Sequence, residues 1–313
     1  MTGPVAGRWD RRRFLGAAAA GATLPWLASA CGASDGPGVD DSNYGTGPSG
    51  TKAGQRATSR FTYAPGDSRF GELWLPSGAG PHPVVVLVHG GFWRTGYDLT
   101  LMNDLASDAA TRGWAAWNIE FRRVGQDGGG WPGTFADVAA AIDHVAVIAE
   151  DAATPLDVDR VAVAGHSAGG HLAAWTAVRA GLPADAPGAE PLVRPVAVVS
   201  QAGVVDLRRA VVDGLGAGAT VELMGATPED EPERYDLGSP IERVPTGVPT
   251  RCVHGRRDDI VPVDQSESYV AAATGAGDEA VLAPFDGDHF AVFDPTHDSW
   301  TDTVGWLRPI LEP

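Results

Sequence analysis

Cysteine and lysine are nearly absent from this chain. Its 313 residues include two cysteines, Cys31 and Cys252, and a single lysine, Lys52. If Cys31 is cleaved off or modified, no disulfide can form, so stability has to come from a packed core. Positive charge is scarce as well, because the formal net charge is −17. Such acidity argues against nucleic acid as a partner.

Signatures of cofactor and metal binding are also missing. The chain has no G-K-[S/T] phosphate-binding string and no G-x-G-x-x-G at the end of a predicted strand. Its histidines and carboxylates do not cluster at the spacing of metal ligands. We therefore expect neither a metal nor a cofactor.

The first 30 residues predict an export signal. The string R-R-R-F-L at residues 11–15 precedes an uncharged, alanine-rich segment at residues 16–30. That segment is too short and too weakly apolar to span a membrane, but it suits the apolar region of a signal peptide. The arginine string resembles a twin-arginine export signal, which carries folded proteins across the bacterial inner membrane. We expect residues 1–30 to be such a signal peptide and the protein to be exported.

Two forms of the exported protein are consistent with A-S-A-C at residues 28–31. The string fits a cleavage site, which gives a secreted protein, or a lipoprotein box in which Cys31 is lipidated, although Ala28 stands where leucine is usual. Residues 31–57 are rich in Gly, Ser, Pro and Asp and predict a flexible tether. Because a tether lets an anchored domain stand off a membrane, we favour a lipid anchor at the outer face of the cytoplasmic membrane.

The remaining residues, 58–313, predict one α/β domain. Apolar runs alternate with segments of helical periodicity, which is typical of a mostly parallel sheet flanked by helices. The predicted strands are residues 60–63, 70–75, 84–88, 115–121, 161–164, 196–199, 250–253 and 280–285; the predicted helices are 99–111, 135–149, 170–180 and 299–311. Residues 202–246 form a long connection, in which we expect a small cap insertion.

A serine stands at the apex of a predicted strand, turn and helix. The string G-H-S-A-G at residues 165–169 directly follows the strand at 161–164 and precedes the helix. In this context G-x-S-x-G is a nucleophile elbow, whose glycines permit a cramped turn that holds the serine hydroxyl clear of the sheet. Ser167 is therefore the predicted nucleophile.

The residues around this serine resemble the α/β-hydrolase fold. The string H-G-G-F-W at residues 89–93 is similar to the H-G-G-x-W string of the kynurenine formamidase-like esterase/lipase branch and to the H-G-G-G string of hormone-sensitive-lipase-type esterases. Glycines here let backbone N–H groups turn toward the serine and hold an oxyanion. The resemblance implies donors from Gly91, Phe92 and Ala168, and we expect His89 to brace the loop.

Two further strings of the same resemblance supply an acid and a base. H-G-R-R-D-D-I-V-P at residues 254–262 matches the string that carries the acidic residue in many of these hydrolases, which places it at Asp258, with Asp259 as the alternative. G-D-H-F at residues 287–290 matches the loop that bears the catalytic histidine, His289. The order Ser167, Asp258, His289 is the order that this fold requires.

Together these features predict an exported serine hydrolase that cleaves small carboxylic esters through an acyl-enzyme. An arylformamide or peptide amide is the alternative substrate, and a catalytically idle envelope protein that only binds is the alternative class. Phe92, Trp93 and, in the loop at 126–133, Trp131 are the candidate substrate contacts. The sequence leaves the acyl chain length and the oligomeric state open.

Overall fold

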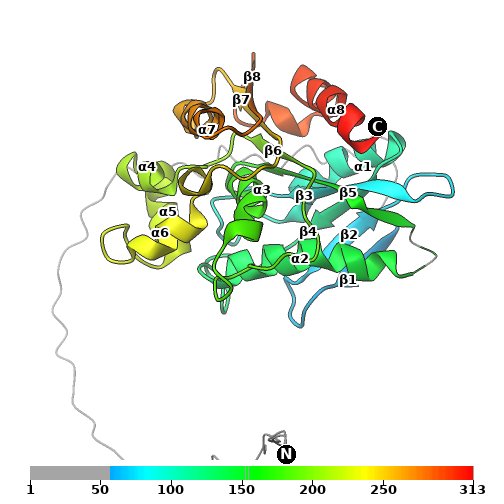
Figure 1. Ribbon diagram of the computed structural model, residues 1–313, viewed down its shortest axis with the longest axis horizontal. Coiled ribbons are helices and arrows are strands. Elements are labelled where there is room, and N and C mark those ends of the chain that lie inside the picture. Colours follow the sequence, from blue (N-terminus) through cyan, green and yellow to red (C-terminus); the bar gives the residue numbers. More distant parts are fainter. Residues whose placement is uncertain (1–56, 152, 154, 313) are drawn as a thin grey trace, which may run out of the picture. The chain divides into compact units, whose positions relative to one another are not determined.

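The computed structural model describes residues 57–151, 153 and 155–312 (Figure 1). The predicted signal peptide, almost all of the predicted tether and Cys31 lie outside these residues. Within the described residues, no helix is both long and apolar enough to cross a membrane.

An eight-stranded sheet forms the centre of the fold, in the order β1-β2-β4-β3-β5-β6-β7-β8. Its strands are β1 (Ser59–Thr62), β2 (Phe70–Trp74), β3 (His82–Val88), β4 (Ala115–Ile119), β5 (Leu156–His166), β6 (Ala197–Gln201), β7 (Thr250–Gly255) and β8 (Ala280–Phe285). The pairs β1–β2 and β2–β4 are antiparallel, and every other neighbouring pair is parallel. The predicted mostly parallel sheet of the α/β-hydrolase fold is confirmed.

Helices connect the parallel strands and cover the sheet. They are α1 (Asn103–Thr111), α2 (Gly133–Ala149), α3 (Ala168–Val178), α4 (Leu207–Val212), α5 (Ala219–Met224), α6 (Pro232–Gly238), α7 (Asp264–Gly275) and α8 (Asp298–Leu311). Short 3-10 turns are η2 (Leu99–Met102), η3 (Arg179–Gly181), η4 (Leu215–Gly218), η5 (Pro240–Arg243) and η6 (Ala291–Phe293). Helices α4, α5 and α6, which fall within the predicted cap segment 202–246, gather at one side of α3 (Figure 1).

Strand β3 shows why the sheet is buried on both faces. Because successive side chains of a strand point to opposite faces, Val84, Val86 and Val88 join the hydrophobic core formed with α2 and α3. Val85 and Leu87 join a second core, formed with α1 and α8. All five side chains are fully buried, as expected for an apolar strand at the centre of a parallel sheet.

Strand β5 begins earlier than the sequence predicts. We expected it at residues 161–164, but it starts at Leu156, and Leu156 and Asp157 pair with His82 and Pro83 of β3 before a register shift. This first half carries the exposed Asp159 and the partly exposed Asp157 and Arg160, so it lacks the apolar run that marks a buried strand. Backbone pairing with β3, rather than side-chain burial, extends the strand.

Cys252 of β7 is the cysteine that lies within the described residues. Its thiol is free and its side chain is fully buried in the core beside α7. Burial raises the pKa of this thiol to about 12, so the thiol is protonated in the native sheet.

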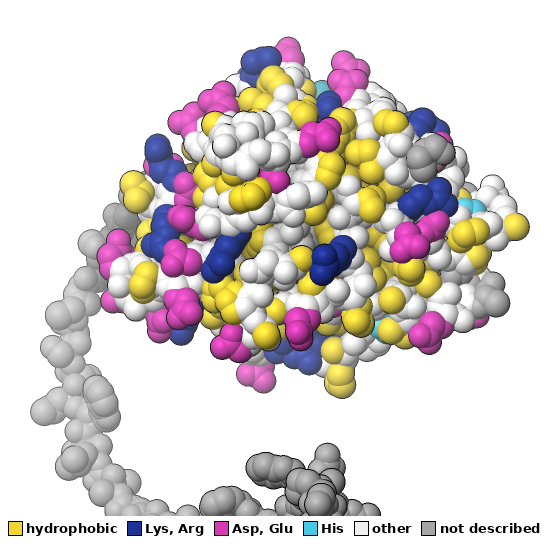
Figure 2. Space-filling model, in the orientation of Figure 1, with side chains coloured by type: hydrophobic (Ala, Val, Ile, Leu, Met, Phe, Trp, Pro, Cys, Tyr) yellow, Lys and Arg dark blue, Asp and Glu magenta, His cyan; other side chains and the backbone are white. Residues whose placement is uncertain are grey.

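Charged side chains are dispersed over the visible face of the molecule. Figure 2 shows Arg side chains scattered among Asp and Glu side chains rather than gathered into a basic patch on this face. Several arginines pair with nearby carboxylates, as Arg208 does with Glu242 and Arg308 with Glu312. These arginines are therefore largely neutralised locally.

Candidate active site

Ser167 lies at the turn between β5, which ends at His166, and α3, which begins at Ala168. Its backbone has φ 55° and ψ −118°, a conformation that residues other than glycine rarely adopt. Two hydrogen bonds hold it there: the Ser167 N–H donates to the carbonyl of Gln201 at 2.8 Å, and the His171 N–H donates to the carbonyl of Ser167 at 3.0 Å. This is the geometry of a nucleophile elbow.

Two glycines make this turn possible through close backbone approach. A methyl group on Gly165 would lie 2.1 Å from the carbonyl oxygen of Gly169. One on Gly169 would lie 2.1 Å from the carbonyl oxygen of Val88 and 2.4 Å from that of His89. The G-x-S-x-G spacing therefore lets α3 pack directly against the ends of β3 and β5.

Asp258 and His289 form a buried hydrogen-bonded pair. Nδ1 of His289 is 2.7 Å from Oδ2 of Asp258, and both side chains are fully buried. The other carboxylate oxygen accepts the N–H groups of Ile260 at 3.0 Å and Val261 at 2.8 Å. Because Nδ1 faces a carboxylate, it carries the proton, which leaves Nε2 of the neutral ring as a proton acceptor.

These hydrogen bonds keep Asp258 ionised. Burial by itself would raise the pKa of the carboxyl, but hydrogen bonds from His254, His289 and the N–H of Val261 bring it well below its ordinary value. An ionised carboxylate at this position would stabilise the imidazolium of His289 whenever its ring takes a second proton.

The backbone of His289 is tied to the strand that carries Ser167. Nε2 of His166 donates to the carbonyl of His289 at 2.9 Å, and the centroids of the two imidazole rings lie 4.5 Å apart. Nε2 of His289 is buried and makes no hydrogen bond to any described residue, Ser167 included. The structure thus brings His289 beside the elbow without closing a hydrogen bond to the serine hydroxyl.

The loop after β3 takes an unusual path beside Ser167. Gly91, Phe92 and Trp93 have φ values of 112°, 54° and 56°, all in the left-handed region. The indole N–H of Trp93 donates to the carbonyl of Ala168 at 3.1 Å, which ties this loop to the start of α3. As the first residue of that helix, Ala168 has a backbone N–H with no acceptor inside the helix. Of the three residues predicted to hold an oxyanion, Phe92 and Ala168 line one pocket with Ser167, and Gly91 directly precedes Phe92.

A buried network of His89, Glu120 and Arg123 supports the loop after β3. His89 is fully buried, its Nδ1 lies 2.7 Å from the carbonyl of Gly90, and its Nε2 lies 3.2 Å from Oε1 of Glu120. Arg123 also contacts Glu120, at 3.2 Å. The expected bracing by His89 matches this arrangement. Glu120 and Arg123 were missed because they belong to no motif; they lie just after β4, which ends at Ile119.

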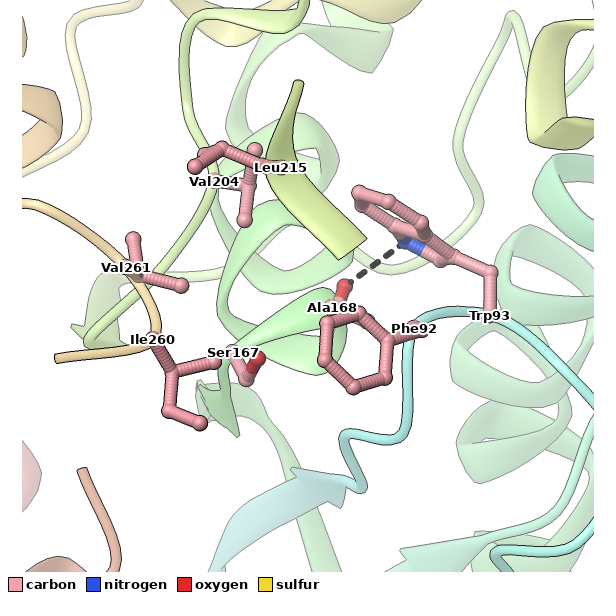
Figure 3. Close-up of a pocket in the computed structure, with 8 residues that line it drawn as sticks. All are labelled: Phe92, Trp93, Ser167, Ala168, Val204, Leu215, Ile260 and Val261. Atoms are coloured by element: carbon pink, nitrogen blue, oxygen red, sulfur yellow. Dashed lines mark hydrogen bonds between the residues drawn. The ribbon is translucent and has the colours of Figure 1, made fainter. Parts of the chain in front are cut away.

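The hydroxyl of Ser167 opens into a small apolar pocket (Figure 3). The pocket has an empty volume of about 270 Å³, including open solvent at its mouth. Besides Ser167, its lining residues are Phe92, Trp93, Ala168, Val204, Leu215, Ile260 and Val261. The part of this volume in which a water-sized sphere fits is far smaller, so the pocket suits only a small group.

The structure separates the two tryptophans that the sequence offered as substrate contacts. Trp93 lines the serine pocket, with its indole edge hydrogen-bonded to α3. Trp131 does not reach this pocket. Its ring packs against Phe135, with the ring centroids 4.9 Å apart, and it lines a separate hollow with Pro183 and Glu233.

His254 is a further residue of this site that sequence reasoning missed. Its Nε2 lies 2.9 Å from the carbonyl of Val261 and 3.3 Å from Oδ2 of Asp258. Its Nδ1 lies 2.8 Å from the hydroxyl of Ser266. The available signal was its place at the head of the H-G-x-x-D string at residues 254–258.

Among the described residues, no group of three or more His, Cys, Asp or Glu side chains has the arrangement of a metal site.

Fold and elbow define the class of this protein as an α/β-hydrolase. The chain belongs to the BD-FAE family, whose model matches residues 72–272. It is 31% identical over 199 residues to the probable carboxylic ester hydrolase LipM of Mycobacterium tuberculosis, a match that covers 61% of this chain and 44% of LipM. It is also 31% identical over 229 residues to esterase LipQ of the same organism, covering 70% of this chain and 53% of LipQ. The chain therefore spans about half the length of these curated relatives.

A solved structure shows the same fold. A truncated carbohydrate esterase from gut microbiota matches with a TM-score of 0.70 and 22% sequence identity, covering 83% of this chain and 100% of that chain.

Proposed function

We propose that this protein is a serine hydrolase that cleaves carboxylic esters through an acyl-enzyme on Ser167. The observation that carries the proposal is the strained elbow of Ser167 beside the buried pair of Asp258 and His289. The relatives LipM and LipQ, which are named as ester hydrolases, support esters ahead of arylformamides or peptide amides.

The chemistry follows from the position of each group. Oγ of Ser167 attacks the ester carbonyl carbon while its proton moves to Nε2 of His289, whose ring is held by Asp258. Backbone N–H groups of Gly91, Phe92 and Ala168 hold the oxyanion of the tetrahedral intermediate. The intermediate collapses when Nε2 returns the proton to the leaving alcohol, which forms the acyl-enzyme.

Water completes the cycle on the same groups. His289 accepts a proton from the water molecule as its oxygen attacks the acyl carbon, and the same N–H groups hold the second oxyanion. The carboxylic acid leaves when Nε2 protonates Oγ of Ser167. The protein returns to its starting state with no cofactor consumed.

Hydrolysis of p-nitrophenyl acetate tests this function. We expect turnover by the wild-type chain and a loss of kcat/KM of at least about 10⁴-fold in Ser167→Ala, because removal of a nucleophile eliminates the covalent route. Asp259→Asn is the control, since Asp259 is the neighbouring carboxylate that the structure does not place on His289. Equal activity in Ser167→Ala and wild type would contradict the proposal.

We also propose that the protein is exported and that Cys31 carries a lipid anchor. Support comes from the arginine string at residues 11–15, the apolar segment at 16–30 and the Gly/Ser/Pro-rich residues 31–57. Metabolic labelling of cells with a fatty-acid probe should mark the wild-type chain and leave Cys31→Ala unmarked. An unlabelled wild-type chain would reject the anchor.

A further inference from the structure

The turn η4 between α4 and α5 has a backbone that few sequences adopt. Gly214, Gly216, Ala217 and Gly218 have φ values of 66°, 60°, 49° and 85°, all left-handed. Three of the four are glycines, which adopt this conformation without steric cost. Between Gly214 and Gly216, Leu215 points into the pocket of Ser167 (Figure 3). The glycines thus present a single large side chain to the site.

This turn packs directly against the oxyanion loop, residues 89–93 after β3. A methyl group on Gly216 would lie 2.4 Å from Cδ1 of Phe92, so the Phe92 ring lies on the backbone of the turn. Arg94, two residues after Phe92, donates to the carbonyl of Ala217 at 3.3 Å and to both carboxylate oxygens of Glu222 at 2.7 and 2.9 Å. The position of Leu215 is therefore fixed relative to the oxyanion loop.

Leu215 and Val204 lie across the pocket from Ser167 (Figure 3). Apart from the hydroxyl of Ser167, the side chains that line the pocket turn apolar groups toward it. His289, which has to face the leaving oxygen in order to protonate it, does not line the pocket, whereas Phe92 and Ala168 do. The group that enters the pocket is therefore the acyl chain rather than the alcohol.

We propose that Leu215, held by the glycine-rich turn, forms the end wall of the acyl pocket and limits substrates to esters of short, saturated acyl groups such as acetyl to butyryl. The empty volume of about 270 Å³ includes open solvent, and its enclosed part has room for about one water molecule, which leaves little room for a longer chain. The inference rests on the proposed ester hydrolysis and adds to it the acyl class and the residue that sets it.

The test compares kcat/KM for p-nitrophenyl acetate, butyrate, hexanoate and octanoate. In the wild-type chain we expect a drop of at least about tenfold between butyrate and octanoate. Leu215→Ala should raise the octanoate-to-butyrate ratio about tenfold, and Leu215→Phe should lower the butyrate-to-acetate ratio about tenfold. Leu192→Ala is the matched control, because Leu192 is 77% exposed and does not line the pocket; its ratios should equal those of the wild type.

Two results would overturn the inference and leave the esterase function intact: a wild-type chain that cleaves octanoate as well as butyrate, or wild-type ratios in both Leu215 variants. Thermal melting of each variant shows whether it folds. Because the two substitutions change the pocket in opposite directions, one folded variant is enough to test the inference. If wild type and Ser167→Ala are equally inactive toward all four esters, the proposed function fails, and the acyl limit fails with it.

Discussion

Two histidines approach the carboxylate of Asp258, although the proposed mechanism uses only one of them. Nδ1 of His289 lies 2.7 Å from Oδ2 of Asp258, while Nε2 of His254 lies 3.3 Å from the same oxygen. The carbonyl of Val261, 2.9 Å from Nε2 of His254, accepts hydrogen bonds but cannot donate, so Nε2 carries a proton. His254 therefore presents an N–H group to Asp258 and fixes the rotation of its carboxylate.

Replacing His254 should weaken catalysis without removing it. In His254→Phe, Asp258 loses one donor and gains rotational freedom, and we expect kcat/KM for p-nitrophenyl acetate to fall about tenfold, the equivalent of ~1.4 kcal/mol. His254→Gln, whose amide can donate again, should recover part of the loss. The effect should be on kcat rather than KM, since His254 does not line the pocket. Unchanged kcat in a folded His254→Phe would refute the positioning role.

At the scale of elements, the elbow depends on how closely α3 approaches β3. A methyl group on Gly169 would lie within 2.4 Å of two carbonyl oxygens, those of Val88 and His89. Both atoms belong to backbone at the buried end of a strand, so neither can move as a flexible side chain would. The contact leaves no room for any other residue at position 169.

Gly169→Ala should therefore destabilise the fold and displace the nucleophile. We expect the free energy of unfolding to fall by ~1–3 kcal/mol from overpacking, and kcat/KM to fall at least about 100-fold, since a displacement of about 1 Å costs that much. Gly305→Ala in α8 is the control: Gly305 has nothing within 4 Å of its added methyl group, so this change should stabilise the helix by ~0.5–1 kcal/mol. Denaturant titration and initial rates measure both; a Gly169→Ala variant as stable and active as wild type would contradict the argument.

Apolar runs, separated by glycine-containing turns, made most elements of the fold predictable. The run of β-branched residues in β3 and the helical spacing of α2 are local signals, and both elements formed where expected. The first half of β5 was missed because its side chains at Asp157 and Asp159 are polar. Only the pairing with β3, which depends on the order of strands in the sheet, places those residues in a strand.

Motifs with a fixed local geometry carry the principal residues of the candidate site. Ser167 and the pair of Asp258 and His289 stand in strings that each place one side chain at the end of a strand. Glu120 and Trp131 have no such string. Glu120 is buried under the oxyanion loop, and Trp131 lines a hollow away from the serine pocket. Both placements depend on tertiary packing, which the spacing of residues along the chain does not encode.

At the scale of the whole molecule, two buried histidines make stability depend on pH. Burial lowers the pKa of His171 to about 4, and burial, with the nearby His289, takes the pKa of His166 well below its ordinary range. Both values lie below the unfolded value of ~6.5, so the unfolded chain binds more protons than the folded one below that pH. The contribution of these two neutral histidines to the free energy of unfolding is therefore fully present above pH ~6.5, and it decreases as the pH drops toward 4.

Denaturant titrations at pH 7.5, 6.5, 5.5 and 5.0 should reveal this dependence. Each of the two histidines contributes a loss of ~1.4 kcal/mol per pH unit below pH ~6.5. His171→Gln removes one titrating group, so its free energy of unfolding should fall less steeply with pH, by that amount per unit, even if the variant is less stable at every pH. Parallel curves for wild type and variant would show that His171 does not titrate on unfolding.

The burial of Cys252 makes its thiol a probe of how often the domain opens. The thiol is fully buried in the central sheet, and its raised pKa keeps it protonated. While β7 stays in place, a thiol reagent can therefore neither reach the sulfur nor find it as a reactive thiolate. A thiol reagent can modify it only in molecules whose sheet has opened. In a Cys31→Ser chain, whose one thiol is that of Cys252, the rate of modification under native conditions therefore measures how often the sheet opens, a kinetic lifetime that activity and melting leave unmeasured.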